Sequence, residues 1–97
     1  MLIKTNFHYP AMLRVAGKNC VIIGGGAVAA RKLATLLAAE AKVTVVAPLF
    51  CDEVQKLASA QGCTLIKDYY KQEYLQNAFV VIAATDNKAV NRQISEA

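Results

Sequence analysis

The run Gly24-Gly25-Gly26-Ala27-Val28-Ala29 separates two segments of different periodicity. Before it, Asn19 to Ile23 is rich in valine and isoleucine, which is typical of a buried strand. After it, apolar residues recur at helical spacing from Gly26 to Ala39. The run fits the pattern G-x-G-x-x-G/A, whose small residues allow a tight turn, close approach of a pyrophosphate and packing of the helix on the strand. A strand, this turn and a helix in succession predict a dinucleotide-binding βαβ unit.

The rest of the chain continues to alternate between strand and helix patterns. We expect three further strands, two further helices and one short helix or turn. The strands are Val43 to Val46, Thr64 to Lys67 and Phe79 to Ala84; the helices are Cys51 to Ala60 and a segment after Asp86; the short element is Gln72 to Asn77. This alternation predicts an α/β, Rossmann-type doubly wound parallel sheet with strand order 3-2-1-4. A crevice then opens between the loops Gly24–Gly26 and Thr85–Asp86, at the carboxyl ends of the first and fourth strands.

The two loops differ in what they can offer a ligand. The helix that follows the glycines presents free N–H groups and a partial positive charge to phosphates. Asp86 is expected to be the N-cap of the last helix. The acidic residue that holds the ribose hydroxyls should follow the second strand, but Val46-Ala47-Pro48 stands there, with no arginine for a 2′-phosphate. We therefore expect NAD as the cofactor, with its ribose held by backbone groups or by residues that the pattern does not identify.

Composition limits the remaining classes of function. The chain has 97 residues, enough for one domain, and a hydrophobic content of 56% favours a packed globule. Its longest apolar stretch is too short for a membrane helix, which needs about 18 residues. The net charge of +4 comes from scattered residues, which argues against nucleic acid and suits an anionic ligand. The odd cysteine count, without C-x-x-C, favours free thiols in the cytoplasm, and the lone His8 predicts no metal site.

Several stretches resemble the precorrin-2 dehydrogenases, the NAD-binding part of siroheme synthases. The family pattern G-G-G-x-V-A-x-R-K matches Gly24 to Lys32, and Val43 to Pro48 resembles the family's second strand. Ala83-Ala84-Thr85-Asp86 with Val90-Asn91 resembles its A-A-T-D…V-N segment. Tyr9-Pro10 and Gly17-Lys18 stand where the family has its lead-in to the first strand, so the resemblance spans nearly the whole chain.

The resemblance implies an NAD-dependent oxidation of precorrin-2, an anionic tetrapyrrole, to sirohydrochlorin; some members also insert ferrous iron. It implies that the cofactor phosphates are held by Gly24, Gly25, Gly26, Ala27 and Val28. Thr85 and Asp86 would lie beside the nicotinamide half. No catalytic residue is assigned within these residues, because the family's candidate aspartate follows a fifth strand that would lie beyond Ala97. Residues 1–97 are thus expected to be the NAD-binding, N-terminal part of a longer enzyme, inactive when isolated.

Two further expectations come from departures from the family. Glu40 stands where the family usually has a helix-ending glycine, and a left-handed backbone there would cost a non-glycine residue roughly 1 kcal/mol. Without the fifth strand, Phe79 to Ala84 would be an open apolar edge that promotes self-association, as in a homodimer. Two alternative functions remain: a non-catalytic nucleotide-sensing module, which usually keeps the acidic residue after the second strand, and an α/β domain with a degenerate site.

Overall fold

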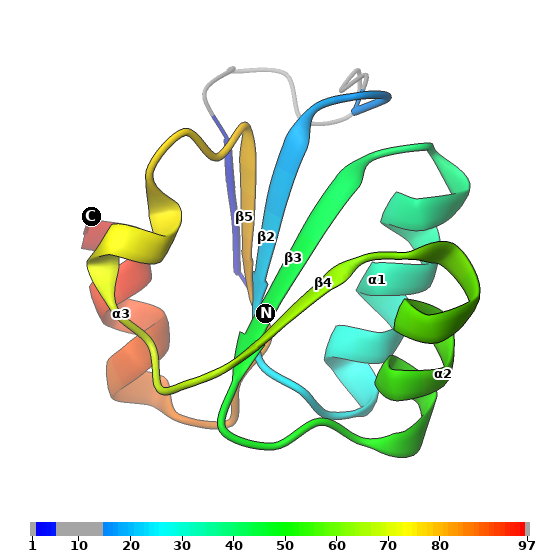
Figure 1. Cartoon of the computed structure of the whole chain (residues 1–97). Coiled ribbons are helices and arrows are strands. Elements are labelled where there is room, and N and C mark those ends of the chain that lie inside the picture. Colours follow the sequence, from blue (N-terminus) through cyan, green and yellow to red (C-terminus); the bar gives the residue numbers. More distant parts are fainter. Residues whose placement is uncertain (1, 6–14, 97) are drawn as a thin grey trace.

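The structure is a computed structural model that describes residues 2–5 and 15–96. These residues form one sheet with helices on both of its faces (Figure 1). Helices α1 (Ala27–Ala38) and α2 (Asp52–Gln61) lie on one face. Helix α3 (Lys88–Glu96) and the short 3-10 helix η2 (Gln72–Leu75) lie on the other. The protein is therefore a three-layer α/β fold, as the sequence predicts.

The four parallel strands have the predicted order. They are β2 (Asn19–Ile23), β3 (Lys42–Ala47), β4 (Thr64–Lys67) and β5 (Val80–Ala83), and they lie in the order β4-β3-β2-β5. This order is 3-2-1-4 when these strands alone are counted, which confirms the Rossmann-type topology. In the register, Ile23 lies opposite both Val46 and Ala83, so β2, β3 and β5 end at one level. The loops that follow these strands consequently meet at one edge of the sheet.

The edge of β5 that faces away from β2 is paired, whereas the sequence predicts an open edge there. Strand β1 (Leu2–Thr5) pairs with β5 in the antiparallel direction, with Leu2 opposite Ala83 and Thr5 opposite Val80. The prediction that β5 would be an open edge was therefore wrong, and self-association through this edge loses its basis. The prediction considered only the parallel strands that alternate with helices in the sequence, whereas β1 pairs with β5 in the antiparallel direction.

The core is divided into two layers by the sheet. Along β2, Cys20 and Ile22 pack with the side chains of α1 and α2, whereas Val21 and Ile23 pack with those of α3 and η2. Strand β5 is buried at each of its residues. Burial on both faces explains why these strands appear in the sequence as continuous apolar runs rather than as an alternating pattern.

The turn after α1 contains a left-handed residue that is not glycine. Glu40 has a φ of 65°, and its carbonyl accepts a hydrogen bond from the N–H of Gly17 at 2.9 Å. Such a conformation costs a non-glycine residue roughly 1 kcal/mol. Helix α2 ends more conventionally at Gly62, whose φ is 74° and whose N–H bonds the carbonyl of Ala58.

In the part of the chain that the structure describes, the three cysteines, Cys20, Cys51 and Cys63, are free thiols, and burial raises the pKa of the Cys20 thiol. None of the helices described is both long and apolar enough to cross a membrane. His8, Tyr9 and Pro10 lie outside the described residues.

Candidate functional site

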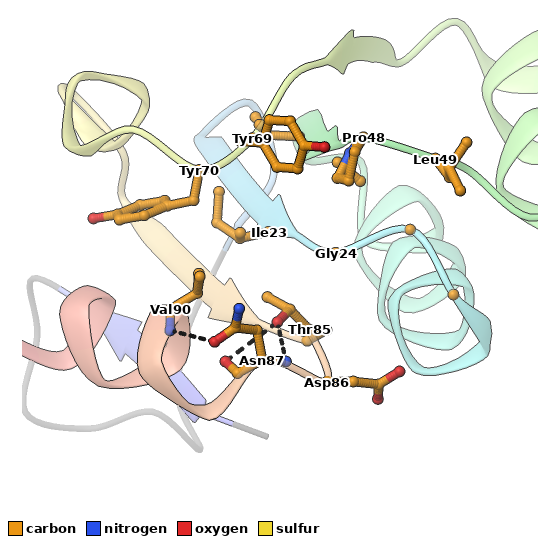
Figure 2. A pocket seen from close by; sticks show the side chains of 15 residues that line it. Ile23, Gly24, Pro48, Leu49, Tyr69, Tyr70, Thr85, Asp86, Asn87 and Val90 are labelled. Atoms are coloured by element: carbon orange, nitrogen blue, oxygen red, sulfur yellow. Dashed lines mark hydrogen bonds between the residues drawn. The ribbon is translucent and has the colours of Figure 1, made fainter.

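A cleft of about 320 Å³ opens at the edge of the sheet where the parallel strands end (Figure 2). Four segments line it: the end of β2 with the glycine loop, the end of β3 with the loop after it, the segment after β4, and the segment after β5. Its lining residues are Ile23, Gly24, Gly25, Gly26, Val46, Ala47, Pro48, Leu49, Tyr69, Tyr70, Ala84, Thr85, Asp86, Asn87 and Val90. The predicted crevice is therefore present, and both loops expected to border it do so.

Gly24 is required by packing between these two loops. Its φ is 134°, a conformation that side chains rarely adopt, and a Cβ atom there would lie 2.5 Å from the carbonyl oxygen of Ala84. The Gly24 N–H donates to the carbonyl of Val46, and the Ala84 N–H donates to that of Ile23. The glycine loop thus lies directly against the end of β5.

Gly25, whose position the fingerprint leaves unspecified, also has a packing role. A Cβ atom there would overlap the carbonyl oxygen of Leu49, and the Gly25 carbonyl accepts a hydrogen bond from the N–H of Cys51 at 2.7 Å. This glycine therefore brings the loop after β3 against the start of α1.

Gly26 is different, because nothing in the fold requires a glycine there. Its φ of −95° and ψ of −160° are extended, and a Cβ atom would meet no described protein atom within 4 Å. The open space lies at the N-terminus of α1, whose first N–H groups have no acceptor within the helix. The first turn carries no acidic residue, and Gly26 provides no side-chain cap. Space and unpaired donors together suit a phosphate group. Ala27 and Val28, which follow, are both exposed.

The segment after β5 is held by its own side chains, although not by the residue predicted. Asn87, not Asp86, is the N-cap of α3: its Oδ1 accepts hydrogen bonds from the N–H groups of Ala89 at 2.9 Å and Val90 at 3.1 Å. The expectation for Asp86 was wrong because the helix begins one residue later than the pattern suggested. Asp86 is exposed, and Figure 2 shows its carboxylate pointing away from α3.

Two further contacts fix Thr85. Its Oγ1 accepts a hydrogen bond from the Asn87 N–H at 2.7 Å, and its carbonyl accepts one from Nδ2 of Asn91 at 3.0 Å. The sequence shows Asn91 only as part of a segment that resembles the family and predicts no role for it. The structure shows that it connects the middle of α3 to the loop bordering the cleft.

The wall formed by the end of β3 is apolar. Where an acidic residue would hold a ribose, Val46 and Ala47 are buried, and Leu49 is 76% exposed. No described residue brings a carboxylate to this wall, because Asp86 is the only acidic residue lining the cleft and comes from the loop after β5. Tyr69, 74% exposed, lines the same wall from the segment after β4, a contribution that sequence reasoning did not foresee.

A hydrogen-bond network holds the segment that carries Tyr69. The Asp68 carboxylate accepts hydrogen bonds from the Tyr74 hydroxyl and the Tyr69 N–H, and it forms an ion pair with Lys71 at 3.2 Å. The hydrogen bond from Tyr74, together with those from Lys71 and the Tyr69 N–H, lowers the pKa of Asp68. The same hydrogen bond to Asp68 raises the pKa of Tyr74. The Asp68 N–H also donates to the carbonyl of Ala47 at 3.1 Å, which joins the segment to the end of β3.

A family described as "Putative NAD(P)-binding" matches residues 11–97. The chain belongs to this NAD(P)-binding family. The match covers both loops that border the cleft and the whole of the described chain except β1. Membership confirms the expected class of cofactor, a nicotinamide dinucleotide.

Relatives of this NAD(P)-binding domain carry more specific names. The siroheme synthase of Pseudoalteromonas translucida is 43% identical over 89 residues, which are 92% of this chain and 19% of that protein. The siroheme synthase of Nitrosospira multiformis is 47% identical over 92 residues, covering 91% of this chain and 20% of that protein. The chain thus spans about one-fifth of the length of these relatives.

A solved structure, that of SirC, a precorrin-2 dehydrogenase, is also similar. It matches with a TM-score of 0.81 and 30% identity, over 87% of this chain and 42% of that one. These similarities confirm the resemblance of this NAD(P)-binding domain to precorrin-2 dehydrogenases and siroheme synthases.

Proposed function

We propose that the chain is the NAD-binding part of a precorrin-2 dehydrogenase, which oxidises precorrin-2 to sirohydrochlorin in siroheme synthesis. The open space at Gly26 carries the proposal. Gly24 and Gly25 are explained by contacts within the protein, whereas the missing side chain at Gly26 leaves open space at the N-terminus of α1, where a phosphate group would fit. The named relatives supply the reaction and the substrate.

Different residues of the cleft would hold different parts of the cofactor. Gly24, Gly25 and Gly26, with the N–H groups of Ala27 and Val28, would hold the pyrophosphate at the N-terminus of α1. Thr85 and Asp86, on the side of the cleft that faces Tyr69 and Pro48, would lie beside the nicotinamide half (Figure 2). The cofactor, when bound, accepts a hydride from the substrate. The protein's own contribution in this region is to bind and orient the dinucleotide.

NAD rather than NADP is proposed because the wall at the end of β3 has no basic side chain. Ala47, Pro48 and Leu49 offer a 2′-phosphate no charged partner. They also lack the carboxylate that nucleotide-sensing modules usually have there, which disfavours that alternative.

The proposal also covers the domain organisation, the substrate, the location and the partners of the protein. Residues 1–97 would form one NAD-binding unit, the N-terminal part of a longer enzyme. The substrate is an anionic tetrapyrrole, which the net charge of +4 suits. The free thiols suit the reducing cytoplasm as its location, with no nucleic acid or membrane as partner. A homodimer would have to form through a surface other than β5.

Titration calorimetry with NAD⁺ tests the proposal. The wild-type chain should bind NAD⁺, and Gly26→Val should abolish binding because its side chain would occupy the path of the pyrophosphate. Ala60→Val, at an exposed position of α2 outside the cleft, is the matched control and should bind as the wild type does. Unchanged affinity in Gly26→Val would show that the phosphates do not lie on this loop.

A further inference from the structure

Tyr69 is a large aromatic residue left exposed on the wall of a binding cleft. Its exposure is 74%, and the neighbouring Leu49 is 76% exposed. Figure 2 shows Tyr69 with Pro48 and Leu49 on one side of the cleft, facing the side formed by Thr85 and Asp86. Apolar surface gathered in this way at a cleft typically marks a contact with a ligand.

The position of this wall indicates which half of a dinucleotide it meets. In the dinucleotide fold, the residue that contacts the adenine-side ribose follows the strand after the glycine loop, which here is β3. The hydrogen bond from Asp68 to Ala47 places the segment carrying Tyr69 directly at that end of β3. The adenosine half therefore lies beside Tyr69 if the pyrophosphate lies at Gly26.

The backbone of Tyr69 is fixed in advance, although its side chain is exposed. Its N–H donates to Oδ1 of Asp68 at 2.7 Å, and the other carboxylate oxygen is held by Tyr74 and Lys71. The adjacent Tyr70 also lines the cleft, but it is half-buried and packs against the core layer beside α3. Of the two tyrosines, only Tyr69 therefore presents most of its surface to solvent.

We propose that Tyr69 stacks on the adenine ring of the cofactor, with Asp68 as the residue that positions it. The inference rests on the proposed NAD-binding function and adds to it a means of holding the adenosine half. Where other dinucleotide sites use a carboxylate on the ribose, this chain uses an aromatic face on the base. Stacking on an aromatic side chain tolerates any base and needs no charged partner.

The test compares Tyr69→Ala, Tyr69→Leu and Tyr69→Phe with the wild type, using NAD⁺, AMP and nicotinamide mononucleotide as separate probes. Tyr69→Ala should weaken the binding of NAD⁺ and AMP by about 5- to 150-fold. Tyr69→Leu should also weaken both, because it keeps apolar volume without a π-face, and Tyr69→Phe should bind nearly as tightly as the wild type. Affinity for nicotinamide mononucleotide should not change in any variant.

Tyrosine fluorescence gives a second readout. AMP should quench the fluorescence of the wild type, and Tyr69→Phe should lose this quenching while keeping its affinity. Asp68→Asn should weaken AMP binding in the wild type and have no effect in the Tyr69→Ala background, because Asp68 acts through Tyr69.

The outcomes separate the two proposals. If the wild type binds NAD⁺ and Tyr69→Ala and Tyr69→Leu bind it equally well, the stacking inference is overturned and the proposed function stands. If the wild type binds nicotinamide mononucleotide and not AMP, the adenosine half is not recognised here and the inference also fails. If the wild type binds no NAD⁺, the proposed function fails, and the inference fails with it.

Discussion

A Cβ atom on Gly24 would lie 2.5 Å from the carbonyl oxygen of Ala84, so the two loops that border the cleft are in direct contact at a glycine. This contact shows that Gly24 has a structural role, in contrast to the glycine that leaves room for a ligand. Gly24 lies between protein atoms, whereas Gly26 faces open space.

Gly24→Ala should therefore lower the free energy of unfolding by roughly 1–3 kcal/mol, because it adds strain at a positive φ as well as an overlap. Gly26→Ala should change it by no more than about 0.5 kcal/mol, since its backbone is extended and its surroundings are open. Urea denaturation of both variants measures the difference. Equal stabilities would contradict this account of the loop.

The N-cap of α3 provides a second pair of neighbouring substitutions. Asn87→Ala should destabilise the protein by about 1 kcal/mol, because the N–H groups of Ala89 and Val90 lose their acceptor. Asp86→Ala should stay within about 0.5 kcal/mol, because its exposed carboxylate caps nothing. Thermal unfolding of the two variants measures both effects. If Asp86→Ala were the more destabilising of the two, Asp86 rather than Asn87 would be the N-cap.

The Asp68 network predicts a dependence of stability on pH. Its hydrogen bonds hold the pKa of Asp68 below the ordinary value of about 3.9, so their contribution is complete above about pH 4. That contribution should be lost as the pH falls through the lowered value. The difference in stability between the wild type and Asp68→Asn should therefore shrink in acid. Urea denaturation of both proteins over a range of acidic pH measures this difference, and a difference that stays constant would contradict the prediction.

Cofactor preference can be tested and then shifted. The wild type should bind NAD⁺ more tightly than NADP⁺, because the wall after β3 offers no cation. Leu49→Arg should improve the ratio of NADP⁺ to NAD⁺ affinity on the order of tenfold, by supplying a charged hydrogen-bond donor. Calorimetry with both cofactors decides, and tighter binding of NADP⁺ by the wild type would overturn the preference for NAD⁺.

Cofactor binding and turnover should separate in these 97 residues. Hydride transfer requires the reacting carbon about 3–3.5 Å from the nicotinamide and a group that takes up a proton. Among the described residues, only Asp86 brings a carboxylate to the lining of the cleft, and no described side chain holds it in place. The chain should bind NAD⁺ and yet leave precorrin-2 unoxidised in an assay of absorbance with NAD⁺ in excess. A rate like that of a full-length siroheme synthase would contradict the prediction.

The parts of the fold that depend on local pattern could be predicted from the sequence. The strand, glycine turn and helix from Asn19 to Ala38 follow from periodicity and from glycine geometry, and the 3-2-1-4 order follows from alternation. Strand β1 could not be predicted in this way, because four residues acquire a strand partner only through pairing with a distant segment.

In the candidate site too, features that depend on neighbouring residues could be predicted better than features that depend on distant ones. The capping role was assigned to Asp86 rather than Asn87 because helix boundaries read from sequence are uncertain by one or two residues. Tyr69 gave no signal of its own, since its place at the cleft depends on the hydrogen bond from Asp68 to Ala47. Residues within a motif could be found from the sequence, and residues brought in by tertiary contacts could not.

The pairing of β1 with β5 also has a consequence for the order of events during synthesis. Among the described strands of this sheet, Leu2–Thr5 is translated first, yet its partner Val80–Ala83 is translated last. Most of these residues must therefore have left the ribosome before β1 can pair with β5. Contacts between segments so far apart in sequence slow folding. A nascent chain stalled before Val80 should leave β1 accessible to proteases and chaperones, and one stalled well beyond Ala83 should protect it.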